Sequence, residues 1–277
     1  MKNSMIALLV LGCFLVPVQA QNAPAPASAQ KAPNAASMPE AESQKARTLL
    51  QKMVTALGGK AYLAYTSRSE QGRTYSFDRG QAKGAANEYW LFWQYPDKDR
   101  IEFTPKRDII DIVNGDQGYE ITFRGTAALP DKQMQDYLRR RARSMEVVAR
   151  EWLKDPQTLM LYAGPSVIEN RQVERVTLLS ARDESVTIAI DASNYLPLRK
   201  SFTYRDPLDH LKTEEVDTYD KYRPEQGMMT AHFVEHTRNG EITFQRYVTK
   251  VEYNPQLSPS LFEAKVTYDQ KKLEGKR

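Results

Sequence analysis

Hydrophobic residues recur at helical spacing near the start of the chain and then alternate along most of the rest. Between residues 42 and 57, apolar side chains fall every three or four positions, and Gly58-Gly59 follows them. This pattern predicts an amphipathic helix that ends at the glycine pair. From Ser67 onward the period changes to two, which is typical of strands with one buried face. The sequence therefore predicts a helix followed by a sheet.

Alternating stretches separated by turn residues predict the strands of this sheet. They cover residues 88–95, 100–104, 108–113, 119–123, 186–190, 196–204, 219–222, 228–237 and 241–253. Asn114-Gly115 and Asn239-Gly240 are typical two-residue hairpin turns. A helical pattern over residues 131–152 interrupts the strands, and Asp155-Pro156 closes it. The expected fold class is therefore mainly β with α (α+β), a large antiparallel sheet with one helix before it and one inserted.

The first twenty residues have the parts of a secretory signal peptide. Lys2 gives a positive start, residues 5–18 are mostly apolar, and Val18-Gln19-Ala20 offers small residues before a cleavage point. We expect residues 1–20 to be removed after Ala20 and the mature protein to be periplasmic. An alternative stays open, because residues 10–13 loosely resemble a lipoprotein processing site that would leave Cys13 as a lipidated N-terminus.

Composition and charge narrow the remaining chain. Residues 21–43 are rich in Pro, Ala, Ser and Gln, which predicts a disordered tether, and residues 44–277 have the length of one all-β domain. The formal net charge of +4 is too small to indicate a nucleic-acid partner. Cys13 is the one cysteine of the sequence. If it is removed with the signal peptide, no disulfide and no thiolate chemistry is expected.

His232 and His236, with Glu235 between them, match the H-x-x-E-H pattern of inverted zinc peptidases. That chemistry needs a helix, where side chains four residues apart share a face. Here the segment alternates like a strand, on which the two histidines would lie about 13 Å apart. We therefore expect no metal site. The motifs of nucleophile elbows, P-loops and dinucleotide sites are also missing from the sequence, so we expect no catalytic residue and no cofactor.

Aromatic residues crowd one short strand and leave both of its faces apolar. They are Tyr89, Trp90, Phe92, Trp93 and Tyr95. Such a strand either packs in an ordinary core or lines a cavity beneath a helix, and the pattern leaves both open. The arginines among residues 139–143 also have two interpretations, a solvated helix face or a contact with lipid headgroups or an acidic partner.

Four short stretches follow one another in a familiar order. Residues 95–102 form a strand–turn–strand unit with Pro96 and Arg100, and residues 114–119 form a hairpin. Residues 190–198 include Leu196-Pro197-Leu198, and Tyr222-Arg223 with Gly227 precede residues 251–255 and Phe262. Together they resemble the LolA/LolB-like superfamily, and most of all its outer-membrane lipoprotein-sorting proteins, over about residues 45–265. Thr230-Ala231-His232 departs from the family, which often has a proline there.

The resemblance implies a curved antiparallel sheet that forms an incomplete β-barrel, with helices covering its concave face. It also implies an apolar cavity for acyl chains. The expected function is a periplasmic carrier that moves lipoproteins or lipids toward the outer membrane without catalysis. Its partners would be an acylated lipoprotein or lipid, an inner-membrane donor and an outer-membrane acceptor, and it would be a monomer. The alternative is an envelope-stress sensor or regulatory binding module similar to RseB.

Strand alternation gives the candidate ligand-binding residues. On strands they are Leu91, Trp93, Ile101, Phe103, Ile121, Phe123, Val186 and Ile188, and on the inserted helix, the expected lid, they are Met134, Leu138 and Met145. Each of them could instead belong to an ordinary core, because the pattern does not show which strand face lines the cavity.

Overall fold

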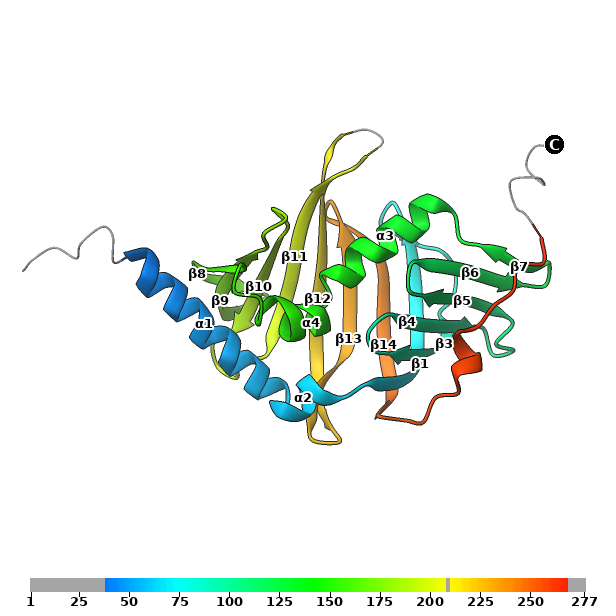
Figure 1. Ribbon diagram of the computed structural model, residues 1–277, viewed down its shortest axis with the longest axis horizontal. Coiled ribbons are helices and arrows are strands. Elements are labelled where there is room, and N and C mark those ends of the chain that lie inside the picture. Colours follow the sequence, from blue (N-terminus) through cyan, green and yellow to red (C-terminus); the bar gives the residue numbers. More distant parts are fainter. Residues whose placement is uncertain (1–37, 208–209, 269–277) are drawn as a thin grey trace, which may run out of the picture.

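The computed structural model (Figure 1) describes residues 38–207 and 210–268. Its helices are α1 (Met38–Leu57), α2 (Lys60–Ala64), α3 (Asp131–Ala142) and α4 (Met145–Val147), with a π-helical turn η1 (Val148–Trp152) and a 3-10 turn η2 (Pro259–Phe262). Within this described part of the chain, no helix is both long enough and apolar enough to cross a lipid bilayer.

The predicted first helix is confirmed, and its C-terminal stop is the predicted one. α1 ends at Leu57, and Gly58 follows with a φ of 129°, which L-residues with side chains rarely adopt. The helix begins earlier than predicted, at Met38, inside the segment interpreted as a tether. Residues 40–42 are exposed and polar or small, so they carry no apolar period that could reveal a helix. The predicted signal peptide and residues 21–37 of the tether lie outside the described residues.

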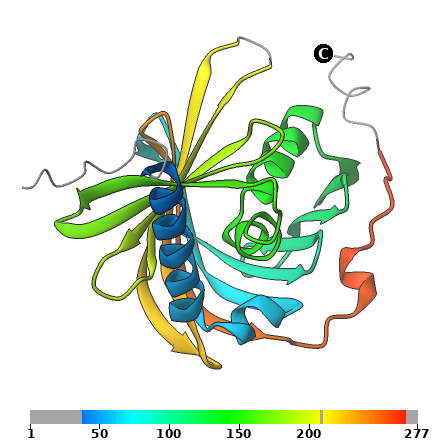
Figure 2. The same ribbon diagram turned by 60° about the vertical axis from the view of Figure 1, so that its left-hand side comes forward.

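One antiparallel sheet holds all strands of the described chain. They are β1 (Ser67–Asp78), β2 (Gln81–Ala82), β3 (Asn87–Gln94), β4 (Lys98–Phe103), β5 (Ile109–Asn114), β6 (Gln117–Thr122), β7 (Gly125–Ala128), β8 (Leu159–Ile168), β9 (Arg171–Leu179), β10 (Ser185–Asp191), β11 (Pro197–Arg205), β12 (Lys212–Glu225), β13 (Met228–Arg238) and β14 (Glu241–Tyr253). Their order is β7-β6-β5-β4-β3-β1-β14-β13-β12-β11-β10-β9-β8, with β2 beside β1. β7 and β8 are the two edges, so the curved sheet is an incomplete barrel, as predicted (Figures 1 and 2).

Both predicted hairpins are confirmed, and one of the two turns lies where predicted. Asn239-Gly240 joins β13 to β14, whereas Gly115-Asp116 joins β5 to β6, because Asn114 is the last residue of β5 and pairs with Gln117. Asn239 and Gly240 have φ values of 51° and 81°, which is the left-handed conformation that a type I′ turn needs at both central positions. The turn thus holds β13 and β14 in the register that aligns their inward side chains.

The inserted helical region is divided, whereas the sequence predicts one helix over residues 131–152. α3 ends at Ala142 and α4 begins at Met145. Ser144 separates them because its Oγ accepts a hydrogen bond from the Val147 amide at 3.2 Å, which caps the second helix. The break lets α3 lie across the middle of the sheet while α4 lies closer to α1 (Figure 1).

Helices cover the concave face of the sheet, as predicted. α1 lies over β8 to β10 at one end, and its buried Leu50 and Met53 share one core with Val176, Val186 and Ile188 of the sheet. α3 and α4 lie inside the curve of the remaining strands (Figure 2). The main core therefore sits between α1 and one half of the half-barrel.

The chain after β14 covers part of the outer, convex face. Arg100 of β4 donates a hydrogen bond to the carbonyl of Leu261 at 3.0 Å, and Thr126 of β7 donates its amide to Thr267 at 2.8 Å. Phe262, in the turn η2, is 1% exposed. Figure 2 shows this segment outside the sheet, on the side away from α3 and α4. The convex face of the strands at this end is therefore partly covered by the C-terminal segment.

Candidate functional site

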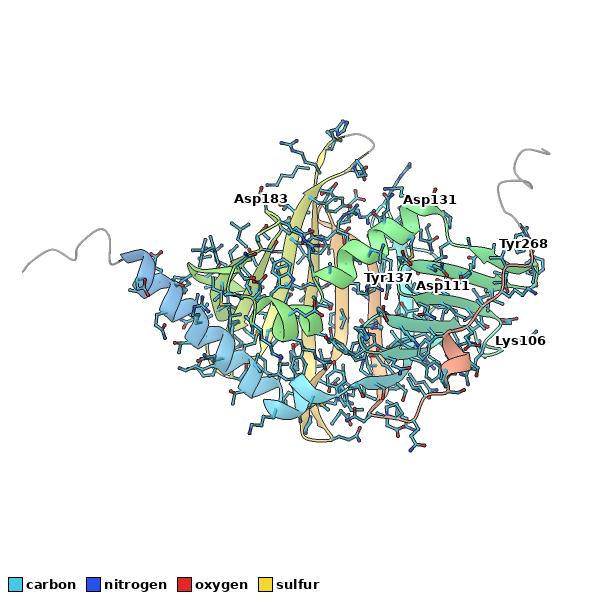
Figure 3. All side chains as sticks on the ribbon, in the orientation of Figure 1. Lys106, Asp111, Asp131, Tyr137, Asp183 and Tyr268 are labelled. Carbon is cyan, nitrogen blue, oxygen red and sulfur yellow. The ribbon has the colours of Figure 1, made fainter. Side chains whose placement is uncertain are left out.

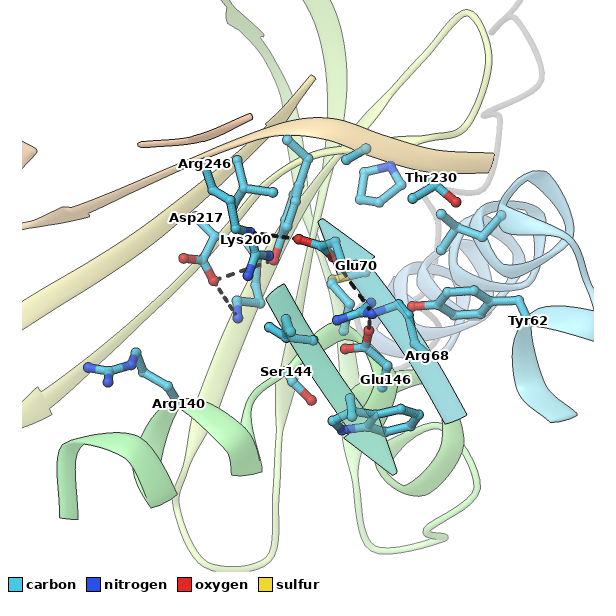
Figure 4. Close-up of a pocket in the computed structure, with 18 of the residues that line it drawn as sticks. Tyr62, Arg68, Glu70, Arg140, Ser144, Glu146, Lys200, Asp217, Thr230 and Arg246 are labelled. Atoms are coloured by element: carbon cyan, nitrogen blue, oxygen red, sulfur yellow. Dashed lines mark hydrogen bonds and ion pairs between the residues drawn. The ribbon is translucent and has the colours of Figure 1, made fainter. Parts of the chain in front are cut away.

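A pocket of about 330 Å³ lies between the concave face of the sheet and the helices (Figure 4). Its apolar wall includes Tyr65, Leu91, Trp93 and Met145. Leu91 and Trp93 project inward from β3, and the ring of Trp93 lies 5.4 Å from that of Tyr65. Aromatic and aliphatic side chains of this kind form a surface that accepts an apolar group.

A buried ion network crosses the pocket beside this wall. Arg68 Nη1 donates to Glu146 Oε1 at 3.0 Å, and its Nε lies 3.8 Å from Glu70 Oε2. Arg246 Nε lies 3.2 Å from the other oxygen of Glu70, which also accepts a hydrogen bond from the Tyr89 hydroxyl. Burial alone would raise the pKa of Glu70, but Arg246 and Arg68 outweigh it and hold that pKa below its usual value. Glu70 is therefore ionised at neutral pH.

A second ion network continues along the neighbouring strands. Lys200 of β11 lies opposite Asp217 of β12, which in turn lies opposite His236 of β13. Lys200 Nζ and His236 Nδ1 each lie 2.7 Å from Asp217, and Glu215 lies 3.6 Å from His236 Nε2 and 2.9 Å from Arg238. Burial would raise the pKa of Asp217, but Lys200 and His236 hold it well below its usual range.

These charged residues share the concave face with the apolar wall. Directly opposed residues of an antiparallel pair point to the same face, and Glu70 lies opposite both Leu91 and Val251. The concave floor is thus apolar under α1, charged over β11 to β14 and β1, and apolar again at β3. We call the charged part, with Glu70, Glu146, Glu215, Asp217 and their partners, the charged belt. A buried charge is costly unless it is paired, and each of these four carboxylates has a cationic partner. The floor differs from the uniformly apolar cavity that the resemblance implies.

Polar contacts attach α3 over the pocket, and Figure 3 shows Tyr137 between α3 and the strands. The Tyr137 hydroxyl donates to the carboxylate of Asp99, and Arg141 Nη1 donates to the carbonyls of Asp97 and Gly115 at 3.2 and 2.7 Å. Burial raises the pKa of Asp99 to about 6, against the lowering effect of the Tyr137 hydrogen bond. Met134 is the one buried residue of α3. Hydrogen bonds and ion pairs therefore contribute much of what holds this helix in place.

The structure distributes the candidate residues over several environments. Those that line the pocket are Leu91, Trp93 and Met145. Ile101 and Phe103 of β4 lie in the same concave rows as Leu91 and Tyr89, and Val186 and Ile188 are fully buried in the core with α1. Met134 of α3 contacts the region of Gly118, and Leu138 of α3 is half-buried. The concave candidates thus divide into pocket wall, neighbouring floor and packed core.

Ile121 and Phe123 do not face the pocket, and their prediction as cavity residues is corrected. Ile121 lies opposite Ile110, whereas the concave row runs through Asp111 and its opposed residue on β6. Phe123 follows β6 in a turn and is 92% exposed. The apolar positions of β5 and β6 include convex ones because the C-terminal segment covers neighbouring strands on that side. Alternation alone shows two faces but not which one is concave.

His232 and His236 lie on β13, so the predicted strand is confirmed. Both face the concave side, while Glu235 faces the other. His232 Nδ1 lies 3.0 Å from the carbonyl of Val248, and its Nε2 lies 3.0 Å from Glu225. Within residues 38–207 and 210–268, no group of three or more His, Cys, Asp or Glu side chains is arranged to hold a metal ion. The motif therefore has the spacing of a metallopeptidase without its helix.

Comparison with known proteins gives matches in structure. No family model and no curated protein matches the sequence. A DUF1329 family protein from Desulfovibrio piger has a TM-score of 0.56 at 11% identity, over 80% of this chain and 97% of that chain. A domain from Vibrio parahaemolyticus that is described as an outer-membrane lipoprotein-sorting protein has a TM-score of 0.51 at 9% identity, over 79% of this chain and 97% of that chain. A LolA superfamily protein from Nitrosomonas europaea has a TM-score of 0.49 at 11% identity, over 79% and 97%. The half-barrel, the helices inside it and the first two of these structural likenesses show that the chain has a LolA-like fold.

Proposed function

We propose that this protein is a periplasmic carrier that binds acyl chains of lipoproteins or lipids and moves them toward the outer membrane. The observation that carries the proposal is the pocket between the open half-barrel and the helices, with Leu91, Trp93 and Met145 in its wall. Its volume of 330 Å³ is near the lower end for ligand sites, about 300–1,000 Å³. A complete acyl chain would therefore enter only when the pocket opens further.

Movement of α3 would supply that opening. One end of the helix is tied by Lys132, whose Nζ lies 3.2 Å from Asp206 and which is 53% exposed. Exposed ion pairs of this kind contribute about 0–1 kcal/mol each, so releasing this end costs little, whereas a larger movement must also break the hydrogen bonds of Tyr137 and Arg141. A shift of α3 would expose the apolar wall, and its return would shield the chain from water. The carrier could thus load and unload without unfolding the sheet.

The carrier role also needs export. We propose cleavage after Ala20 and a periplasmic location, with an acylated lipoprotein or lipid as cargo and with donor and acceptor proteins at the inner and outer membranes. The name of the Vibrio parahaemolyticus domain, which refers to outer-membrane lipoprotein sorting, supports this proposal by analogy of fold.

We further propose that the protein binds its ligand without catalysis. His236, which lies on the concave face, has one ring nitrogen beside Asp217 and the other beside Glu215. A general base needs a nitrogen that can reach the ligand's proton, and both nitrogens of this ring face carboxylates. The arrangement supports a structural ion network rather than acid–base chemistry.

Tryptophan quenching by a brominated acyl chain tests the proposal. Trp93 lines the pocket, whereas Trp90 lies on the opposite face of β3, with Arg107 over its ring at 5.2 Å. A fatty acid brominated along its chain should quench the wild-type fluorescence. Trp93→Phe should lose most of that quenching, while the matched variant Trp90→Phe should keep it, because bromine quenches only a ring it can touch.

The outcome separates the pocket from other binding surfaces. Quenching that survives in Trp93→Phe but disappears in Trp90→Phe would place the ligand on the convex face and reject the proposed site. Failure of acyl ligands of several lengths to quench or bind would reject the carrier function.

A further inference from the structure

One arginine in the pocket keeps part of its hydrogen-bonding capacity unused. Arg246 reaches the pocket from β14, and its Nε lies 3.2 Å from Glu70. This Nε is buried and forms an ion pair with Glu70, but it makes no hydrogen bond with any residue that the structure describes. Arginine presents its donors in a planar fork that matches the oxygens of a carboxylate or phosphate. Part of this donor fork is therefore unsatisfied where Arg246 lines the pocket.

Two other cations, Lys200 and Arg140, line the same pocket (Figure 4). Lys200 is 3% exposed and forms an ion pair with Asp217 at 2.7 Å, which leaves donors of its ammonium group available. Arg140 comes from the lid helix α3 and lines the pocket. In residues 38–207 and 210–268, no ion pair or hydrogen bond engages the Arg140 side chain. Figure 4 shows Arg246 beside the Lys200–Asp217 pair, while Arg140 lies apart on α3 with its side chain directed away from that pair.

The lining charges do not balance. The basic side chains that line the pocket are Arg68, Arg140, Arg141, Lys200 and Arg246, and the acidic ones are Glu70, Asp99, Glu146 and Asp217. Each of these carboxylates already has a partner in the protein. Glu70 pairs with Arg246 and Asp99 accepts from Tyr137. Glu146 pairs with Arg68, and Asp217 pairs with Lys200. The polar groups of the pocket that remain available to a ligand are therefore hydrogen-bond donors of the basic side chains. The lining also carries one more positive than negative charge. A buried excess charge is stabilised when an anion pairs with it.

We propose that the ligand of this pocket is an amphiphile with an oxyanion head, a carboxylate or phosphate, held by Arg246, Lys200 and Arg140. Its apolar tail would lie along Leu91, Trp93 and Met145. This inference rests on the proposed carrier function and adds the chemistry of the ligand's head. It also gives the charged belt a role, because the belt fixes Arg246 through Glu70 and Lys200 through Asp217. Arg140 would complete the site when its side chain turns from α3 toward Lys200.

Calorimetric titration with ligands that share one tail tests the head directly. The probes are dodecanoate, dodecyl phosphate, dodecanol, dodecyltrimethylammonium and inorganic phosphate, all below their micelle concentrations. The two anionic amphiphiles should bind at least about tenfold more tightly than dodecanol, since a charge-assisted hydrogen bond is worth that much. The cationic amphiphile should bind more weakly than dodecanol. Comparison of dodecanoate with dodecyl phosphate shows which oxyanion the site prefers.

Variants assign the effect to named residues. Arg246→Met and Arg140→Met should each reduce the affinity for dodecanoate by about tenfold or more while leaving dodecanol binding unchanged. Arg73→Met makes the same charge change at an exposed position opposite Tyr247 on the convex face, and it should leave both affinities unchanged. If Arg246→Met does not fold, the affinity of Arg140→Met for dodecanoate tests the inference. The Arg140 side chain has no polar contact among the described residues, so its loss should not affect folding.

The outcomes distinguish this inference from the carrier proposal. Equal affinity for dodecanol and the anionic amphiphiles would overturn the inference and leave the carrier in place. Binding of inorganic phosphate as tightly as dodecyl phosphate would also overturn it, because the tail would then contribute nothing. If no amphiphile binds, the proposed function itself fails, and the inference fails with it.

Discussion

Replacement of Glu70 by alanine is expected to lower the free energy of unfolding by about 3–5 kcal/mol, because it breaks a buried ion network. Glu70 is 6% exposed and lies between Arg68 and Arg246. Without it, Arg246 loses its nearest carboxylate, while Arg68 keeps Glu146. The cost comes mainly from leaving a guanidinium in the interior without an opposite charge. Urea unfolding at pH 7, followed by circular dichroism, measures the change.

Two variants control this experiment. Glu252→Ala removes a carboxylate from an exposed position of β14 and should change the unfolding free energy by less than about 0.5 kcal/mol. Glu70→Gln keeps the shape of the side chain and removes only its charge, so its loss measures the electrostatic part. A loss below about 1 kcal/mol for Glu70→Ala would mean that water reaches the two arginines. The belt would then not be a buried network.

Replacement of Ile188 by alanine is expected to cost about 2–5 kcal/mol of stability, the range for deleting a buried aliphatic side chain. Ile188 is 0% exposed and belongs to the core that α1 covers. It is also one of the candidate ligand-binding residues. Because it is packed and does not line the pocket, its loss should leave the affinity for an acyl ligand unchanged within about twofold.

Leu161→Ala is the matched control for Ile188→Ala. Leu161 lies on the edge strand β8 and is 43% exposed, so its truncation should cost less than about 1 kcal/mol. The Ile188 prediction fails if Ile188→Ala unfolds at the same urea concentration as the wild type. It also fails if that variant loses ligand affinity while keeping its stability, since Ile188 would then belong to the ligand site.

The sequence predicted most of the strands because their signals are local. Asn239-Gly240 is a turn by its own chemistry, and alternation marks β13 and β14 on either side of it. Alternation does not tell which face of a strand is concave, and that limit explains why Ile121 was wrongly predicted to line the cavity. The covering segment around Phe262 lies far along the chain, so no pattern near β6 could reveal it.

The charged belt escaped prediction for a related reason. Lys200 has the same phase along β11 as Phe202 and Tyr204, but sequence reasoning assigned apolar residues to the inside and left the lysine out. A charge in an inward position becomes plausible only when its partner is known, and Asp217 comes from another strand. Paired inward charges on neighbouring strands are a signal that a pairing map would have revealed. Such a map requires the strand order, which short patterns do not provide.

Native mass spectrometry of the protein purified without detergent tests the carrier account most directly. We expect a bound species that organic solvent releases and that has the mass of an acyl-bearing molecule. In Trp93→Asp, a carboxylate in the apolar wall should abolish this species, because an unpaired charge there opposes the acyl chain. A wild-type protein that carries no such species, and acquires none when incubated with fatty acids, phospholipids or an acylated lipoprotein, would contradict the account.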